Sequence, residues 1–228
     1  VTTSTVASPG FAMSAAAYDS SRDEMIIAGT SVARYGVPSS GNLSSLTVPN
    51  LSLGGATATS IAVYGSKVVL GSNLGGWVKI WDRADSSVLT VSGLTLPGGL
   101  LATSGGVVVG AGKGAVLTRI GWGGTVLGSV DLRVARHPSE DVPYLLTRVL
   151  AYALEYEDGL EFSKGLDDGD QPAIWRKDAQ GRVTTWIEVG SPLPERLHRA
   201  SKACDRVVVH CHRRPDLLIQ KCAKERVH

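Results

Sequence analysis

A glycine-terminated apolar run recurs three times in the first 130 residues and sets the strongest constraint on the fold. MIIAG ends at Gly29, KVVLG at Gly71 and VVVG at Gly110, with separations of 42 and 39 residues. Each run follows one shorter strand-like piece and precedes two more, so every repeat carries four short apolar runs divided by Gly, Ser and Asn. Four strands at a period of about 40 residues are typical of β-propeller blades.

Three repeats are too few to close a propeller, which usually has about 4–8 blades. Three interpretations stay open: blades are missing, copies of the chain associate to complete a ring, or the repeats form a small open stack or a β-sandwich. We therefore predict an all-β half over residues 1–129 that is propeller-like with about three blades, or a sandwich. A homo-oligomer formed through the incomplete ring is one expected partner.

The composition changes near residue 130, which predicts a second domain of another architecture. Residues 1–130 carry 7 Lys/Arg and 5 Asp/Glu, whereas residues 131–228 carry 16 of each, and 22 of the 27 glycines lie before residue 131. Patterns at helical and strand spacing then follow in the order helix, three strands, helix, strand, helix. Residues 130–228 are therefore expected to form an α/β domain.

The elements of this second half are predicted from periodicity and from end signals. Ser139 is the expected N-cap of the first helix, and Gly159 is expected to end it. Strands are expected within 160–164, 172–178, 182–190 and 206–212, and helices over 194–204 and 215–227.

Several separated blocks of the second half resemble the YaeQ family. They are ARHPSE, LLTRVLAYALEYEDGLEFSKGL, PAIWRKD, WIEVGSP and ERLHRASKA, between about Val130 and His228. Members of that family usually continue with further strands, so the domain is expected to be truncated at its C-terminal end. The family is similar in fold to the PD-(D/E)xK nuclease superfamily, and the resemblance implies that fold and a metal-dependent nuclease acting on DNA or RNA.

The resemblance also implies a carboxylate site. Metal-dependent phosphodiester cleavage needs hard oxygen ligands that hold a divalent cation. Asp170 and Glu188, at the ends of neighbouring strands, would bind Mg²⁺ or Mn²⁺, and Glu140, at the start of the first helix, would assist the metal or the water. Each has an ordinary alternative: a carboxylate on the helix dipole for Glu140, a turn residue for Asp170, and a solvated or salt-bridged strand end for Glu188.

One departure from the nuclease pattern concerns the lysine. The third motif reads Glu188-Val189-Gly190 in place of Glu-x-Lys. Lys202 on the following helix is the expected substitute for stabilising the phosphate charge, with Lys164 as the other candidate. The missing lysine leaves an inactive, binding-only domain as an alternative.

The net charge limits which partners the chain can bind through electrostatic attraction. The net charge is only +2, so a nucleic-acid site has to be a local basic surface, for which we expect Arg196, Arg199, Arg213 and Arg214. Three cysteines without a CxxC spacing fit reduced thiols and a cytoplasmic location. No apolar run reaches the roughly 18 residues of a transmembrane helix, so no membrane partner is expected.

Two further interpretations belong to other classes. In one, the protein is non-enzymatic and structural, and its β-repeats bind a protein or a glycan, for example within a virion or another assembly. In the other, the chain is an engineered or rearranged fusion, because the two halves differ so sharply in charge and glycine content.

Overall fold

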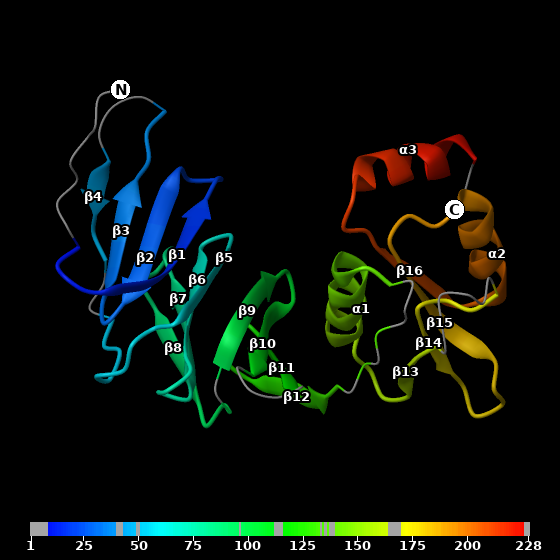
Figure 1. Cartoon of the computed structure of the whole chain (residues 1–228), viewed down its shortest axis with the longest axis horizontal. Coiled ribbons are helices and arrows are strands. Elements are labelled where there is room, and N and C mark those ends of the chain that lie inside the picture. Colours follow the sequence, from blue (N-terminus) through cyan, green and yellow to red (C-terminus); the bar gives the residue numbers. More distant parts are fainter. Residues whose placement is uncertain are drawn as a thin grey trace. The chain divides into compact units, whose positions relative to one another are not determined.

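A computed structural model of the 228-residue chain describes residues 9–39, 43–48, 51–95, 97–111, 116–132, 134, 136, 140–163 and 170–225. The chain divides into two compact units, Val1–Leu132 and Arg133–His228 (Figure 1). Within the described residues, the first unit contains strands only and the helices lie in the second.

The strands described in the first unit form three four-stranded antiparallel sheets, each a meander in which consecutive strands are neighbours. Sheet A contains β1 (Met13–Asp19), β2 (Glu24–Gly29), β3 (Val32–Gly36) and β4 (Ser44–Leu46). Sheet B contains β5 (Ser60–Tyr64), β6 (Lys67–Ser72), β7 (Trp77–Asp82) and β8 (Val88–Ser92). Sheet C contains β9 (Pro97–Thr103), β10 (Gly106–Ala111), β11 (Val116–Ile120) and β12 (Val126–Asp131). The predicted all-β half with four strands per repeat is confirmed; the described strands do not close into a propeller or barrel.

The three sheets pack face to face around their first strands. Strand β5 contacts both β1 and β9, and the sheets fan out from these strands (Figure 1). The glycine-terminated run of β6 lies in the middle of this stack. Val68 and Leu70 join an apolar cluster with sheet A, and Val69 joins another with sheet C. Because both faces of sheet B are covered, neither face of β6 lies in water, and its residues 68–70 are all apolar instead of alternating with polar ones.

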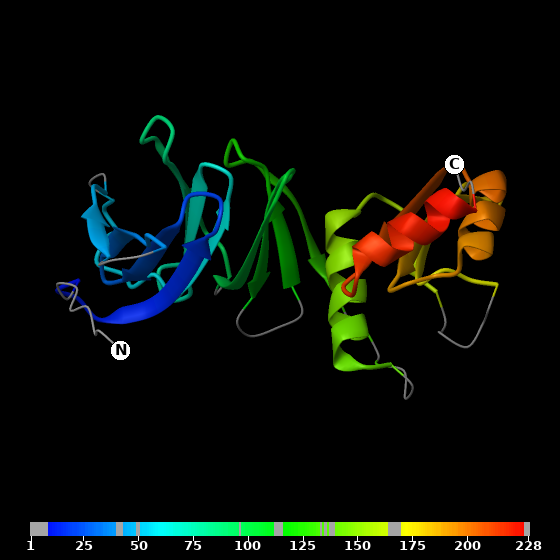
Figure 2. The same ribbon diagram turned by 90° about the horizontal axis from the view of Figure 1, so that it is seen from above.

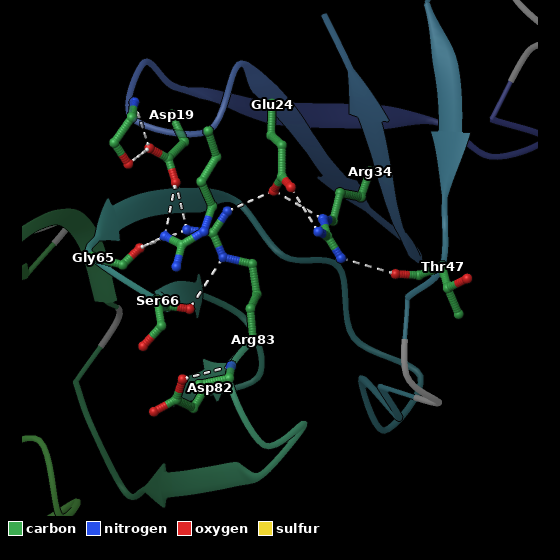
Figure 3. A network of polar contacts seen from close by, with 11 residues as sticks. Asp19, Glu24, Arg34, Thr47, Gly65, Ser66, Asp82 and Arg83 are labelled. Atoms are coloured by element: carbon green, nitrogen blue, oxygen red, sulfur yellow. Dashed lines mark hydrogen bonds and ion pairs between the residues drawn. The ribbon is translucent and has the colours of Figure 1, made fainter.

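A network of ion pairs joins sheet A to sheet B (Figure 3). Arg83 follows β7, and its side chain is only 3% exposed. Its guanidinium donates to Asp19 Oδ2 at 2.5 Å and to Glu24 Oε2 at 2.7 Å, both in sheet A. Arg34 binds the same Glu24 from β3 at 2.6 Å. Buried carboxylates are stable in the folded state only when they are paired in this way.

The described residues of the second unit form one mixed sheet and three helices. Helix α1 (Val142–Leu154) precedes β13 (Leu160–Phe162), β14 (Ile174–Lys177) and β15 (Val183–Val189); α2 (Pro194–Ala203), β16 (Arg206–His210) and α3 (Pro215–Lys224) follow. Sheet D has the order β13-β14-β15-β16, in which only the last pair is parallel, with α2 as the crossover between its strands. This agrees with the predicted order of elements; the assignment to the PD-(D/E)xK fold stays a prediction.

Helix α1 covers one face of sheet D. The ring of Tyr152 stacks on that of Phe162 with centroids 4.5 Å apart, and the Tyr152 hydroxyl donates to the carbonyl of Leu160 at 3.0 Å. The helix begins later than predicted, because Asp141 is its N-cap and accepts the backbone N–H of Tyr144 at 2.7 Å. Ser139, the expected N-cap, lies outside the described residues.

Two expectations concern membrane-spanning helices and the cysteines. Among the described residues, no helix has both the length and the apolar character needed to cross a bilayer. Cys204, Cys211 and Cys222 are free thiols.

Candidate functional site

Glu188 stands near the end of β15, on the opposite face from the apolar side chains on either side of it. Side chains alternate along a strand, so Trp186 and Glu188 share one face while Ile187 and Val189 share the other. Glu188 is only 6% exposed. Its Oε1 accepts the indole Nε1–H of Trp186 at 2.7 Å and the Nε–H of Arg196 at 2.5 Å. The apolar strand therefore ends in a carboxylate that is held by two donors.

Arg196, in the first turn of α2, connects Glu188 with the loop that precedes β14. Its Nη2 donates to the backbone carbonyl of Gln171 at 2.6 Å, and its guanidinium carbon lies 5.4 Å from the ring centroid of Trp186. The guanidinium thus binds both Glu188 and the residue next to Asp170. This carboxylate draws the Arg196 side chain onto the sheet, where it is only 20% exposed; its place in a nucleic-acid surface stays a prediction.

Glu140, just before α1, is also held by arginine. It is 1% exposed, and Arg148 binds it through Nε at 2.8 Å and Nη2 at 3.0 Å. Such two-pronged guanidinium–carboxylate pairs are the strong form of the interaction. Arg136 donates to the backbone carbonyl of Glu140 at 2.8 Å. Glu140 therefore anchors the start of α1.

Tyr144 lies within electrostatic range of both ion pairs. Burial raises the pKa of its hydroxyl to about 12; the negative charges of Glu188 and Glu140 add to the rise, and the positive charges of Arg148 and Arg196 oppose it. The Tyr144 ring also lies against Gly190, where an added Cβ would stand 3.7 Å from Cε2. Glu140 and Glu188 are therefore brought around one protonated tyrosine.

Tyr144 was missed in the sequence because it lies off the apolar stripe of α1. The only available signal is its position three residues after Asp141, in the first turn of the helix.

The remaining predicted site residues are dispersed. Asp170 is exposed at the end of the loop before β14. Lys202 is exposed in the last turn of α2, about 9 Å along the helix axis from Arg196. Arg199 is exposed, Arg213 pairs with Asp141 at 3.1 Å, and Arg214 pairs with Asp216 at 3.3 Å. Lys164 lies outside the described residues.

These positions do not fit a divalent metal ion. Glu188 and Glu140 each bind a guanidinium, so the cation beside the strand end is Arg196. Within the described parts of the chain, no group of three or more His, Cys, Asp or Glu side chains is placed to hold a metal. Mg²⁺ and Mn²⁺ need several free oxygen ligands. The Mg²⁺ or Mn²⁺ site at Asp170 and Glu188 stays a prediction.

A further ionic cluster lies at the other end of α1. Glu155, the C-cap, binds His210 Nε2 at 3.0 Å and Arg206 Nη2 at 2.6 Å, both from β16. The hydrogen bond from His210 lowers the pKa of Glu155 to about 2, with Arg206 adding to the effect and burial opposing it. No sequence pattern links Glu155 to Arg206 or to His210, because each of them lies more than 50 positions after it.

Four cations of the C-terminal region are exposed and form no ion pair with any described residue. Arg199 and Lys202 lie on α2, and Lys221 and Lys224 lie in the last turn of α3. The C-terminal end of α3 lies beside α2 in both views (Figures 1 and 2). Residues 196–224 hold eight Lys/Arg and two Asp. Two helices therefore present unpaired positive charge on neighbouring segments.

Comparison with known proteins concerns this second unit. Residues 124–228, a little under half of the chain, match the family model described as YaeQ protein. The "Uncharacterized protein YaeQ" of Escherichia coli K12 is 35% identical over 70 residues, which cover 31% of this chain and 39% of that protein. Its namesake from Salmonella typhi is 31% identical over 81 residues, 36% and 45% of the two chains.

A solved structure gives a similar match. The crystal structure of the YaeQ protein from Pseudomonas syringae is 38% identical, with a TM-score of 0.41, over 44% of this chain and 56% of that one. The chain spans less than half the length of the curated relatives it matches.

Proposed function

We propose that the YaeQ domain carried by the second unit of this chain binds nucleic acid, through the exposed cations of α2 and α3. The observation that supports this is the set of four exposed cations without an ion pair to a described residue: Arg199, Lys202, Lys221 and Lys224. Phosphate neutralisation by Lys and Arg supplies most of the affinity of sequence-independent binding. A net charge of only +2 means that such a local surface has to carry the interaction.

The carboxylates of the domain support binding rather than cleavage. Glu188 is paired with Arg196 and Glu140 with Arg148, so the positive charge beside each carboxylate is already supplied by a guanidinium. Of the predicted nucleic-acid arginines, Arg199 alone contributes to the proposed surface, since the other three pair with acidic side chains.

The binding test is a salt titration. Fluorescence anisotropy measures the affinity of the full chain for a labelled 20-mer duplex between about 50 and 200 mM salt. The double variant R199Q/K202Q is expected to weaken binding. It should reduce the slope of log K against log salt by about 1.8, at about 0.9 for each lost phosphate contact. The variant K221Q/K224Q is expected to do the same.

The control removes two charges elsewhere. The variant R22Q/K79Q neutralises two cations of the first unit and should leave both the affinity and the salt slope unchanged. Equal losses in the control and in R199Q/K202Q would show that net charge alone drives the interaction. An absence of binding by the unmodified chain at 50 mM salt would remove the proposed function.

The metal-dependent nuclease predicted from the resemblance has its own test. Titration calorimetry with Mn²⁺ on the unmodified chain, E188Q and D170N is expected to show no binding that depends on Glu188, because Arg196 already holds its carboxylate. Mn²⁺ binding and plasmid cleavage that both disappear in E188Q would establish the nuclease. Arg196 would then have to release Glu188 during the reaction.

A further inference from the structure

Sheet A carries apolar side chains on both of its faces. On the face toward sheet B, Ile26, Ala28 and Val32 pack in the cluster shared with β6 and β7. The opposite face, the outer face of sheet A, is fixed by the strand register. Its rows pair Ala16 with Ile27 and Ala33, and Tyr18 with Met25 and Tyr35. None of these six outer positions carries a charged residue.

The outer face is only partly covered. Tyr18 is 55% exposed, Ala16 is exposed, Met25, Ile27 and Ala33 are half-buried, and Tyr35 is buried. A sheet that faces water on one side normally alternates apolar and polar residues. The run Met25-Ile26-Ile27-Ala28 of β2 lacks that alternation. It has the pattern of a strand buried on both sides.

Sheet B shows which element covers a strand that is apolar on both sides in this fold. Its central run, Val68-Val69-Leu70 of β6, is apolar on both sides because sheet A covers one face and sheet C the other. The covering element on each side is another four-stranded sheet of the same repeat. The occupant that matches the outer face of sheet A is therefore a further sheet of this kind.

The far end of the stack offers a matching face. In sheet C, Val107 and Val109 point toward sheet B, so Val108 and its register partner Leu101 lie on the other face. Leu117 and its partner Val130 lie on that same face, as does Arg119, the β11 partner of Val108. We call these five residues the outer face of sheet C; Val108 is buried and the other four are half-buried. One chain cannot bring its own sheets A and C together, since sheet B separates them, but a second copy supplies both faces.

We propose that two copies of this chain associate head to tail, with the outer face of sheet A of each copy packed on the outer face of sheet C of the other. Two such contacts close a ring of six sheets, which lies within the range of about 4–8 blades in propellers. The contact is between two different surfaces and closes at two copies, so it buries both outer faces and leaves no open end for further growth.

The first measurement is the mass of the full chain in solution. Size exclusion with light scattering is expected to give twice the single-chain mass of 23.9 kDa. Ala16→Arg places a cation on an exposed position of sheet A, and Leu117→Arg places one on a half-buried position of sheet C. Each variant alone should give the single-chain mass, with its circular dichroism spectrum unchanged as a check on folding.

Mixing the two variants tests the pairing of the faces. An A16R chain keeps an intact sheet C face and an L117R chain keeps an intact sheet A face. An equimolar mixture should therefore restore part of the double mass, which neither variant forms alone. The control I219R, at a 68% exposed position on α3, should keep the double mass.

Three results would overturn the proposal. They are a single-chain mass for the unmodified protein, a mass other than twice that of the chain, or a double mass that survives A16R. If both variants are monomeric and folded but the mixture stays monomeric, the two outer faces do not pair with each other, and the head-to-tail arrangement is wrong.

Discussion

Arg83 is the residue on which the seam between sheets A and B depends most. Replacing it with alanine leaves Asp19 and Glu24 without the cation that binds both. Breaking a buried ion pair from one side costs about 3–5 kcal/mol, so we expect R83A to lower the free energy of unfolding of the first unit by that amount. Urea unfolding followed by tryptophan fluorescence in a W175F/W186F background reports on this unit alone, since Trp77, Trp81 and Trp122 all lie in it.

Arg22 provides the comparison for this measurement. It lies 3.7 Å from the same Asp19, but its side chain is 39% exposed. Exposed pairs contribute at most about 1 kcal/mol, so R22A should fall below that value. Equal effects of R22A and R83A would show that burial does not decide the strength of the network.

Glu155 predicts an acid-sensitive second unit. The pKa of its carboxyl is lowered to about 2 by the hydrogen bond from His210 and by Arg206, against an ordinary value of 4.5. A lowered pKa stabilises the fold above the unfolded pKa, and this contribution is lost as pH falls from about 4.5 to 2. At pH 7, E155Q should cost about 1–2 kcal/mol, and the difference from the unmodified chain should vanish near pH 2.

The signal at 222 nm measures this effect, because the described helices all lie in the second unit. D178N serves as the control, since Asp178 is a turn residue whose pKa is lowered mainly by backbone donors. A cost of E155Q that is the same at pH 7 and pH 2 would contradict the assignment.

For single residues, the sequence predicts where acidic side chains lie better than it predicts which arginines they pair with. Strand alternation correctly brings Glu188 to the end of β15 on the opposite face from Ile187. Its partner Arg196 lies on the next helix, and Arg148 reaches back eight positions to Glu140. Such pairings depend on how α1 and α2 sit on the sheet, which no local pattern specifies.

Among the elements, the β9–β10 hairpin has a strict backbone requirement. Gly106 has φ +133°, and an added Cβ would lie 2.2 Å from the carbonyl oxygen of Ile120. We expect G106A to destabilise the first unit by more than about 1 kcal/mol, because alanine rarely adopts this conformation and would clash with the backbone of β11. The same urea titration measures it.

The neighbouring glycine is a matched control. A Cβ at Gly105 would meet nothing within 4 Å. G105A should therefore change the stability by no more than about 0.5 kcal/mol in either direction. If the two variants behave alike, the loss comes from the flexibility of the turn and not from the contact with Ile120.

Element positions follow closely from the sequence in the first unit because apolar runs and glycine turns alternate sharply there. The three glycine-terminated runs are the second strands of sheets A, B and C. Helix α1 was placed less well. Its capping side chain is Asp141, since Pro143 suits the first turn of a helix whose N-cap stands just before it. Both Ser139 and Asp141 are residue types that cap helices, and the position of Pro143 is the local feature that favours Asp141.

At the scale of the whole molecule, the two compact units are expected to fold separately. Residues 133–228 expressed alone should keep the 222 nm signal, and residues 1–132 alone should keep a β-sheet spectrum and the double mass proposed above. Circular dichroism and light scattering on the two fragments test this. A helical signal that is lost in the shorter C-terminal fragment would mean that the second unit needs the first in order to fold.

The change in composition near residue 130 corresponds to two ways of stabilising a fold. The glycine-rich half is stabilised by stacking sheets with apolar faces, and the charged half by arginine–carboxylate pairs between helices and one sheet. The number of sheets and their packing order follow from the repeat. The ion-pair partners do not, because they depend on contacts between residues distant in sequence.

The two seams of the first unit differ in chemistry, and they should therefore respond differently to acid. Sheets A and B meet around carboxylates whose pKa values are lowered, so acid protonates them and loosens that seam first. Sheets B and C meet through an apolar cluster and the stacked rings of Tyr64 and Trp122. Apolar contacts weaken on cooling, and both seams contain an apolar cluster, so low temperature acts on both seams whereas acid acts on the first.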